Sequence, residues 1–266
     1  MDEPDRPSAD AIRLTAAAVR RTLRRHAHRT RAIGVARFFK TGPGEYGDGD
    51  RFIGVTVPAQ RLVARRFRDL PLNETDSLLQ SPVHEERLTA LLILVDQFTH
   101  RRTDERQRQR IFRLYMKRLA FINNWDLVDT SAAPIVGGWL ARSPDLAQQA
   151  RRLARHGRHD DLLGRLARSK NVWSRRVAMI ATFQFTTNGD HREAIRIATL
   201  LVGDEHDLIQ KAVGWMLREV GKQASAEALR RFLTRHAATM PRTALRYAIE
   251  RLPAAERRRW MEAHLA

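Results

Sequence analysis

The sequence predicts an all-α fold, a curved HEAT-like helical-repeat solenoid with a basic concave face, and three observations lead to this prediction. Hydrophobic residues make up 43% of the chain but aromatic ones only 7%, so Leu, Ala, Ile and Val carry the apolar content, which suits helices. From Asn73 onward, apolar residues recur at helical spacing between short breaks that contain Asn, Gly, Asp, Ser or Pro. Helix pairs return about every 35–45 residues, the period of stacked repeats. A globular helix bundle is the alternative all-α fold.

The N-terminal part of the chain starts with a polar segment and then two helices. We expect residues 1–8 to be disordered and residues 9–266 to form a single HEAT-like repeat domain. Ser8 or Asp10 is suited to cap a helix that runs to Arg29, because both side chains accept hydrogen bonds from a first helical turn. A short helix over residues 32–39 follows.

The next segment changes character. Residues 40–50 contain Gly, Pro and Asp in a cluster that is typical of a loop, and residues 51–57 are expected to be extended. Pro58 suits the first turn of a helix that ends near Arg68. Further helices are expected over residues 73–80, 84–100, 103–121, 125–141, 143–155, 158–168, 171–187, 190–203, 206–222, 225–237, 241–251 and 254–265.

The charge of the chain indicates its partner. The formal net charge is +18 and the pI is near 11.4, and a folded domain this basic favours a polyanion. Nucleic acid is the leading candidate and an anionic membrane surface the second. An Arg-rich proteome would account for part of the excess charge. No apolar stretch approaches the roughly 18 residues of a membrane span, so no membrane partner and a cytoplasmic location are expected.

Several kinds of chemistry are excluded by composition or by missing motifs. The chain has no cysteine, which excludes disulfides, thiolate metal sites and thiol catalysis. It contains no P-loop, no HExxH pair and no GxSxG elbow. The loop at residues 40–50 lacks the Lys-Ser/Thr ending of a phosphate loop and is interpreted as structural. We therefore expect neither a metal nor a cofactor.

Four segments have residue patterns that suit binding or catalysis. Trp125 and Asp129 are four residues apart, so they project from one side of one helix. A core Trp and a surface Asp would show the same spacing. Three further segments supply cations that are suited to contact phosphate. They are Arg176 on the face of Trp173, a stripe of Lys211, Trp215, Arg218 and Lys222, and the pair Arg242 and Arg246. For the stripe around Trp215 the alternative is a Trp ring shielded by Lys and Arg stems, and for Arg242 and Arg246 it is an ordinary basic helix face.

Together these segments resemble the AlkD family of DNA alkylation repair proteins. The matching stretches run in order over nearly the whole chain beyond residue 30. They are residues 38–58, 87–95, 122–129, 172–183, 206–222 and 240–250. The resemblance implies a HEAT-like solenoid and excision of positively charged bases, chiefly N3-methyladenine and N7-methylguanine, from duplex DNA.

The resemblance also assigns roles to particular positions. It implies that Asp129 is the catalytic carboxylate and that Trp125 and Trp215 are the two active-site indoles. It places Arg176 in contact with DNA and puts Lys211 and Arg218 on the DNA-binding side. The expected activity is monofunctional, without a deep pocket for the base, and the expected assembly is a monomer at the bacterial nucleoid. The alternative function is a non-catalytic HEAT-repeat scaffold that binds nucleic acid or protein.

Overall fold

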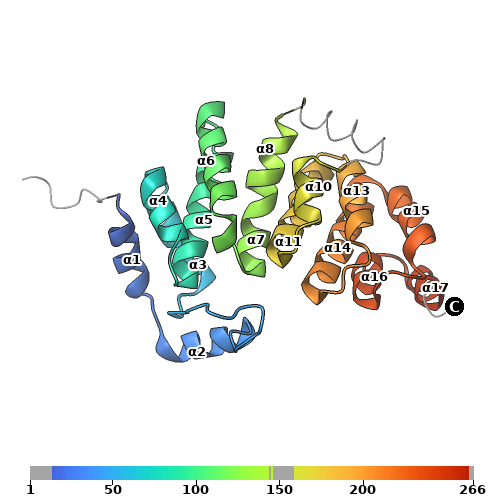
Figure 1. Cartoon of the computed structure of the whole chain (residues 1–266), viewed down its shortest axis with the longest axis horizontal. Helices are drawn as coiled ribbons and strands as arrows, with labels where there is room; N and C mark the ends of the chain where they lie inside the picture. The colour runs from blue at the N-terminus through green and yellow to red at the C-terminus, as the bar shows by residue number, and fades with distance from the viewer. Residues whose placement is uncertain (1–13, 144, 146–158, 264–266) are drawn as a thin grey trace, which may run out of the picture. The chain divides into compact units, whose positions relative to one another are not determined.

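The protein is helical throughout the part that the structure describes. The computed structural model describes residues 14–143, 145 and 159–263. Over these residues it contains helices and turns, and its β-structure is limited to an isolated bridge between Arg51 and Val83. Figure 1 shows neighbouring helices of the C-terminal half of the chain lying side by side. The prediction of an all-α helical-repeat fold is confirmed.

The chain divides into two compact units, residues Met1–Gln97 and Phe98–Ala266. The division falls within α5 (His84–Thr99). The interpretation of residues 9–266 as one domain stays a prediction, and the expected disorder of residues 1–8 concerns residues outside those described. No helix in the described ranges combines the length and the apolar character that crossing a membrane requires.

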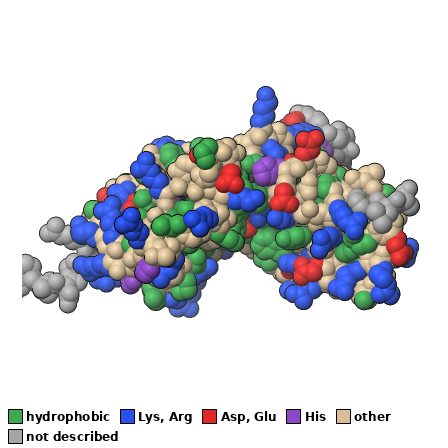
Figure 2. All heavy atoms as spheres, turned by 90° about the horizontal axis from the view of Figure 1, so that it is seen from below, with side chains coloured by type: hydrophobic (Ala, Val, Ile, Leu, Met, Phe, Trp, Pro, Cys, Tyr) green, Lys and Arg blue, Asp and Glu red, His purple; other side chains and the backbone are tan. Residues whose placement is uncertain are grey.

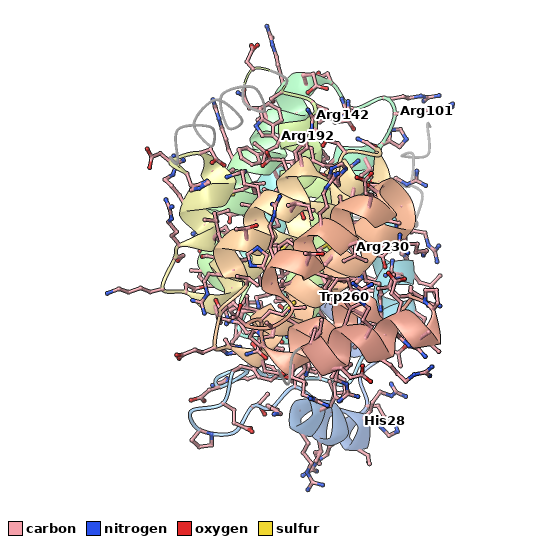
Figure 3. The ribbon with its side chains drawn as sticks, turned by 90° about the vertical axis from the view of Figure 1, so that its right-hand side faces the viewer. His28, Arg101, Arg142, Arg192, Arg230 and Trp260 are labelled. Carbon is pink, nitrogen blue, oxygen red and sulfur yellow. The ribbon has the colours of Figure 1, made fainter. Side chains whose placement is uncertain are left out.

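The first unit begins with two short helices, α1 (Ala16–Arg24) and α2 (Arg29–Phe38). The expected caps Ser8 and Asp10 lie outside the described residues, and the hydroxyl of Thr15 caps α1 instead. The helix that was predicted to reach Arg29 ends at Arg24. The reason is that His28 is extended, its N–H donates to the carbonyl of Ile53, and its ring then caps α2 (Figure 3).

The remainder of the first unit contains α3 (Val57–Arg66), α4 (Leu72–Leu79) and the start of α5. The loop of residues 40–50 is anchored to α5 through Asp50, whose carboxylate pairs with His84 and with Arg87. Glu85 accepts hydrogen bonds from the N–H groups of the neighbouring extended segment, including that of Gly54 at 2.7 Å. These buried contacts support the interpretation of the loop as structural.

The second unit follows the predicted helix order closely. The helix expected over residues 125–141 is continuous but contains a π-helical turn. The helix expected over 143–155 lies mostly outside the described residues. The elements are α6 (Glu105–Lys117), η1 (Leu119–Phe121), α7 (Trp125–Ser131), η2 (Ala132–Gly137), α8 (Gly138–Ala141), α10 (Leu162–Ala167), α11 (Val172–Ala181), α12 (Phe183–Thr187), α13 (Arg192–Leu201), α14 (Asp207–Glu219), η3 (Val220–Ala224), α15 (Ala226–His236), α16 (Arg242–Ile249) and α17 (Ala254–Ala263).

Helix α11 is largely buried in the second unit. Val177, Ala178 and Met179 are fully shielded from solvent, and α11 packs against both α7 and α14. At the C-terminal end, Arg230 of α15 pairs with Glu256 of α17, on the side where Trp260 is buried (Figure 3). The packing of α7 and of α14 against α11 brings three of the predicted segments together.

Candidate functional site

Helix α7 presents the predicted Trp–Asp pair on one face. The side chain of Asn124, which is fully buried, accepts a hydrogen bond from the N–H of Trp125 at 2.8 Å and starts the helix. Trp125 and Asp129 follow four residues apart, and both are half-buried. The indole and the carboxylate therefore reach solvent from one side of a helix whose other face, with Leu127 and Val128, is in the core.

The carboxylate of Asp129 is held by Arg176 of α11. The guanidinium donates from Nε to Oδ1 and from Nη2 to Oδ2, each over 2.8 Å. This is the two-pronged geometry that makes arginine–carboxylate pairs strong and directional. The side chain of Arg176 is only 6% exposed and that of Asp129 is 18% exposed, so the acid is in part accessible to solvent whereas the arginine is nearly buried.

The third side of the Arg176 guanidinium is also occupied. Its Nη1 donates to the backbone carbonyl of Leu208, in the first turn of α14. One arginine thereby connects α7, α11 and α14. The sequence predicted that Arg176 contacts DNA, whereas here its donors point at Asp129 and at Leu208. The carbonyl of Leu208 is a partner that sequence reasoning missed, because a backbone acceptor leaves no signal in the residue type.

Two opposing effects act on the pKa of Asp129. Burial raises the pKa of this carboxyl above its ordinary value, and the nearby negative charge of Asp126 adds to the rise. The hydrogen bonds and the positive charge of Arg176 act in the other direction, but burial is the larger effect. The arginine therefore limits the rise in pKa and favours the ionised carboxylate.

A buried hydroxyl pair lies behind the acid. The phenol of Tyr115 and the hydroxyl of Ser131 are 3.1 Å apart, and Ser131 donates to the carbonyl of Leu127 at 2.5 Å. Burial raises the pKa of Tyr115, and the negative charge of Asp129 raises it further. The phenol is therefore neutral at physiological pH, and the interior beside Asp129 holds polar groups that already have partners.

Helix α14 carries the predicted cationic stripe, with a half-buried Trp215 in the middle. Lys211 pairs with Asp207 at 2.6 Å and Arg218 with Glu250 at 2.5 Å. Lys222, in the π-helical turn η3, is 60% exposed. Leu208 and Trp215 are seven residues apart and so share a face of α14.

Arg242 and Arg246 are both exposed on α16, the helix that packs most closely on α14. Residues of α14 and α16 line an open hollow of about 380 Å³, which we call the α14–α16 groove. A second hollow of about 300 Å³ is lined by Arg218, Lys222 and Arg251 over an apolar floor. The α14–α16 groove is lined by Asp207, Lys211, Thr243, Arg246, Tyr247 and Glu250.

Positive charge is distributed rather than gathered at one point. Figure 2 shows Lys and Arg side chains spread over the face that it presents, with Asp and Glu among them. Within the described ranges, His, Asp and Glu side chains form no cluster of three that is arranged to hold a metal ion. A long polyanion fits this distribution better than a small, highly charged ligand does.

Comparison with known proteins identifies the family. The family model described as DNA alkylation repair enzyme matches residues 19–252. The chain belongs to the DNA alkylation repair enzyme family. Its role is therefore in the repair of alkylation damage to DNA, and the stretches that carried the resemblance in the sequence lie largely within the matched range.

Two solved structures are similar to this DNA alkylation repair family member in fold. A predicted DNA alkylation repair enzyme from Enterococcus faecalis is 16% identical, with a TM-score of 0.62 over 86% of this chain and 98% of its own. AlkD2 from Streptococcus mutans is also 16% identical, with a TM-score of 0.51 over 90% of this chain and 98% of its own. A search of curated proteins gave no significant match.

Proposed function

We propose that this DNA alkylation repair protein is a monofunctional DNA glycosylase that hydrolyses the N-glycosidic bond of cationic alkylated purines, N3-methyladenine and N7-methylguanine, in duplex DNA. One observation carries the proposal: a partly exposed carboxylate, Asp129, is fixed by a buried arginine one helical turn from the half-buried indole of Trp125. A carboxylate in this setting is suited to stabilise positive charge in a reacting group.

Hydrolysis of the glycosidic bond of a cationic purine requires few groups besides this carboxylate. Alkylation at N3 or N7 makes the purine cationic, so the base leaves without being protonated. Positive charge then develops on the deoxyribose, and Asp129 stabilises it while it orients the attacking water. The electron-rich faces of Trp125 and Trp215 enclose the sugar and stabilise the same charge.

Arg176 acts on this reaction through Asp129. It occupies one edge of the carboxylate, and each carboxylate oxygen retains a further lone pair for water or for the sugar. The two hydrogen bonds also fix the plane of the carboxylate, so its orientation is set before the substrate binds. We therefore assign Arg176 as the positioning residue of the acid.

Cations of α14, η3 and α16, which range from partly to fully exposed, bind the DNA backbone. The phosphate ligands that we propose are Lys211, Arg218, Lys222, Arg242 and Arg246. Arg242 has the most favourable surroundings for a phosphate, because it lies at the start of α16, where no side chain caps the free N–H groups. The partner is double-stranded DNA that contains alkylated bases, and the protein acts as a monomer without metal or cofactor.

The lyase step of a bifunctional glycosylase requires an amine with a lowered pKa. Lys211 is a candidate amine on the stripe, but its side chain is 40% exposed and paired with Asp207, whereas a reactive lysine lies in a desolvated pocket or beside another cation. We expect no covalent adduct when the protein is incubated with abasic DNA and borohydride. Trapping of the DNA on Lys211 would contradict the monofunctional assignment.

A non-catalytic scaffold is the second candidate function, and one observation favours it. Arg176 neutralises Asp129, as it would if the pair served only to join α7 and α11. A purely structural pair has no need of solvent exposure at the acid, however, and the side chain of Asp129 is 18% exposed.

Release of 7-methylguanine from methylated duplex DNA separates these two functions. The wild-type protein should release the base, and Asp129→Asn should lose nearly all release while it retains DNA affinity. Equal release by both proteins would contradict the catalytic assignment, and no release by either would favour the scaffold.

A further inference from the structure

The α14–α16 groove has a composition that phosphate contact alone does not explain. It contains two cations, Lys211 and Arg246, two carboxylates, Asp207 and Glu250, a hydroxyl and an aromatic ring. A surface built only to grip phosphates gains nothing from the carboxylates, which repel them. The groove therefore has the features of a site for a ligand with both an anionic and an uncharged, hydrogen-bonding part.

Tyr247 is the most informative residue of the groove. It is 37% exposed, and it is the one large apolar side chain of the second unit that is classed as exposed in the described ranges. Its Cβ is also held in place, because a Cβ added at Gly214 of α14 would lie only 2.5 Å from it. Tyr247 is thus fixed where the backbones of α14 and α16 approach each other, and its partly exposed ring loses little conformational entropy when it binds a ligand. A flat ring of this kind is a platform on which a base can stack.

The two cations of the groove are accessible to a ligand. Within residues 14–143, 145 and 159–263, Arg246 forms no ion pair with the rest of the chain. Lys211 is paired with Asp207, but the two side chains are 40% and 58% exposed, and exposed pairs of this kind contribute little and exchange readily. A phosphate can therefore bind Arg246 and also contact Lys211 without breaking a buried interaction.

We propose that the α14–α16 groove binds a single unpaired nucleotide of DNA, with its base stacked on Tyr247 and its phosphate on Arg246 and Lys211. Glu250 is 49% exposed although it pairs with Arg218, so Glu250 and Asp207 can accept hydrogen bonds from N–H groups of the base edge, and the hydroxyl of Thr243 can donate or accept one. The hollow of about 380 Å³ falls within the range of about 300–1,000 Å³ that is usual for small-ligand sites.

The proposal specifies an unpaired nucleotide because of the geometry of duplex DNA. Both faces of a base are covered by its neighbours inside a duplex, so an aromatic side chain can stack on a base only after it leaves the helix. This inference rests on the proposed function only to the extent that DNA is the ligand, and it does not require that the protein cleave a glycosidic bond.

The experiment compares two duplexes of equal length, one fully paired and one with a single unpaired thymidine, by fluorescence anisotropy at fixed salt. The wild-type protein should bind the bulged duplex more tightly. Tyr247→Leu preserves Cβ but removes the ring, and it should lower affinity for the bulged duplex by about 5- to 100-fold, the effect of losing one base–aromatic stack. Tyr247→Phe should retain the preference, because it keeps the ring.

Arg235→Gln is the matched control for Arg246→Gln. Arg235 is an exposed arginine of α15, and it does not line the groove. Arg246→Gln should weaken binding of the bulged duplex more than binding of the paired duplex. Arg235→Gln should leave the ratio of the two affinities unchanged. Equal affinity of the wild-type protein for both duplexes, or a preference that survives Tyr247→Leu, would overturn the inference. A preference for the bulge without any base release would sink the glycosylase assignment and leave the groove assignment intact.

Discussion

Substitutions in the Asp129–Arg176 ion pair can separate the contribution of Asp129 to stability from its contribution to catalysis. Asp129→Asn removes the charge from one partner and leaves the other, a guanidinium with a side chain only 6% exposed, without its counter-ion. Breaking a buried pair from one side costs about 3–5 kcal/mol. Because Asp129 itself is 18% exposed, we expect the lower end, about 3 kcal/mol.

The second substitution, Arg176→Gln, tests whether this loss comes from the pair. Alone it leaves a partly buried carboxylate and the Leu208 carbonyl without their donor, and it should destabilise the protein by a similar amount. Combined with Asp129→Asn it leaves two neutral amides that can hydrogen-bond to each other. The double variant should therefore regain much of the stability that either single change removes, which is a coupling energy of about 2–3 kcal/mol.

Urea unfolding followed by tryptophan fluorescence is the suitable assay. All five Trp residues lie beyond residue 97, so the signal reports the second unit alone. With a slope of about 3 kcal/mol per molar, a loss of about 3 kcal/mol lowers the midpoint by about 1 M. If the Asp129→Asn midpoint coincides with that of the wild type, the pair does not stabilise the fold. If the stable double variant still releases 7-methylguanine, the carboxylate is not catalytic.

Three further outcomes are expected. Base release should fall on acidification with an apparent pKa above the ordinary value of about 3.9 for Asp, since burial raises the pKa of Asp129. In Arg176→Gln the fall in base release at low pH should begin at a still higher pH, because the group that lowers the pKa of Asp129 is gone. If the pH dependence does not move, the titrating group is another residue. The slope of log affinity against log salt should be less steep by about 0.9 in Arg246→Gln, and an unchanged slope would exclude Arg246 as a phosphate ligand. Gly214→Ala should destabilise the second unit by about 1–3 kcal/mol, because its Cβ would lie 2.4 Å from a backbone carbonyl of α16, while Gly203→Ala, which meets nothing within 4 Å, should be nearly neutral in the same unfolding assay.

The order of the helices and the register of residues along them followed from the sequence alone. The apolar spacing of α14 determines which residues are buried and leaves Lys211, Trp215 and Arg218 on one stripe. Likewise the four-residue spacing of Trp125 and Asp129 was sufficient to place both on one side of α7. Which residues share a face of a helix depends only on their spacing along the chain, so the sequence alone is enough to predict it.

The start of α2 shows where local reasoning was insufficient. The basic run before Arg29 is compatible with one long helix, but the chain turns at His28 because its N–H bonds to the carbonyl of Ile53, 25 residues further along. A backbone partner at that distance has no local sequence signal. For the same reason the loop of residues 40–50 was interpreted as structural without its anchors, His84 and Arg87, being known.

Only the tertiary structure decided what Arg176 binds and what surrounds Tyr247. A guanidinium forms the same two hydrogen bonds with a phosphate as with a carboxylate, so residue type cannot distinguish a DNA contact from an ion pair with an acid 47 positions away. Tyr247 lines a groove because Gly214 lets α16 approach α14 closely. Residue type determines the chemistry that a side chain offers, whereas its partner depends on which distant segments the packed helices bring within reach.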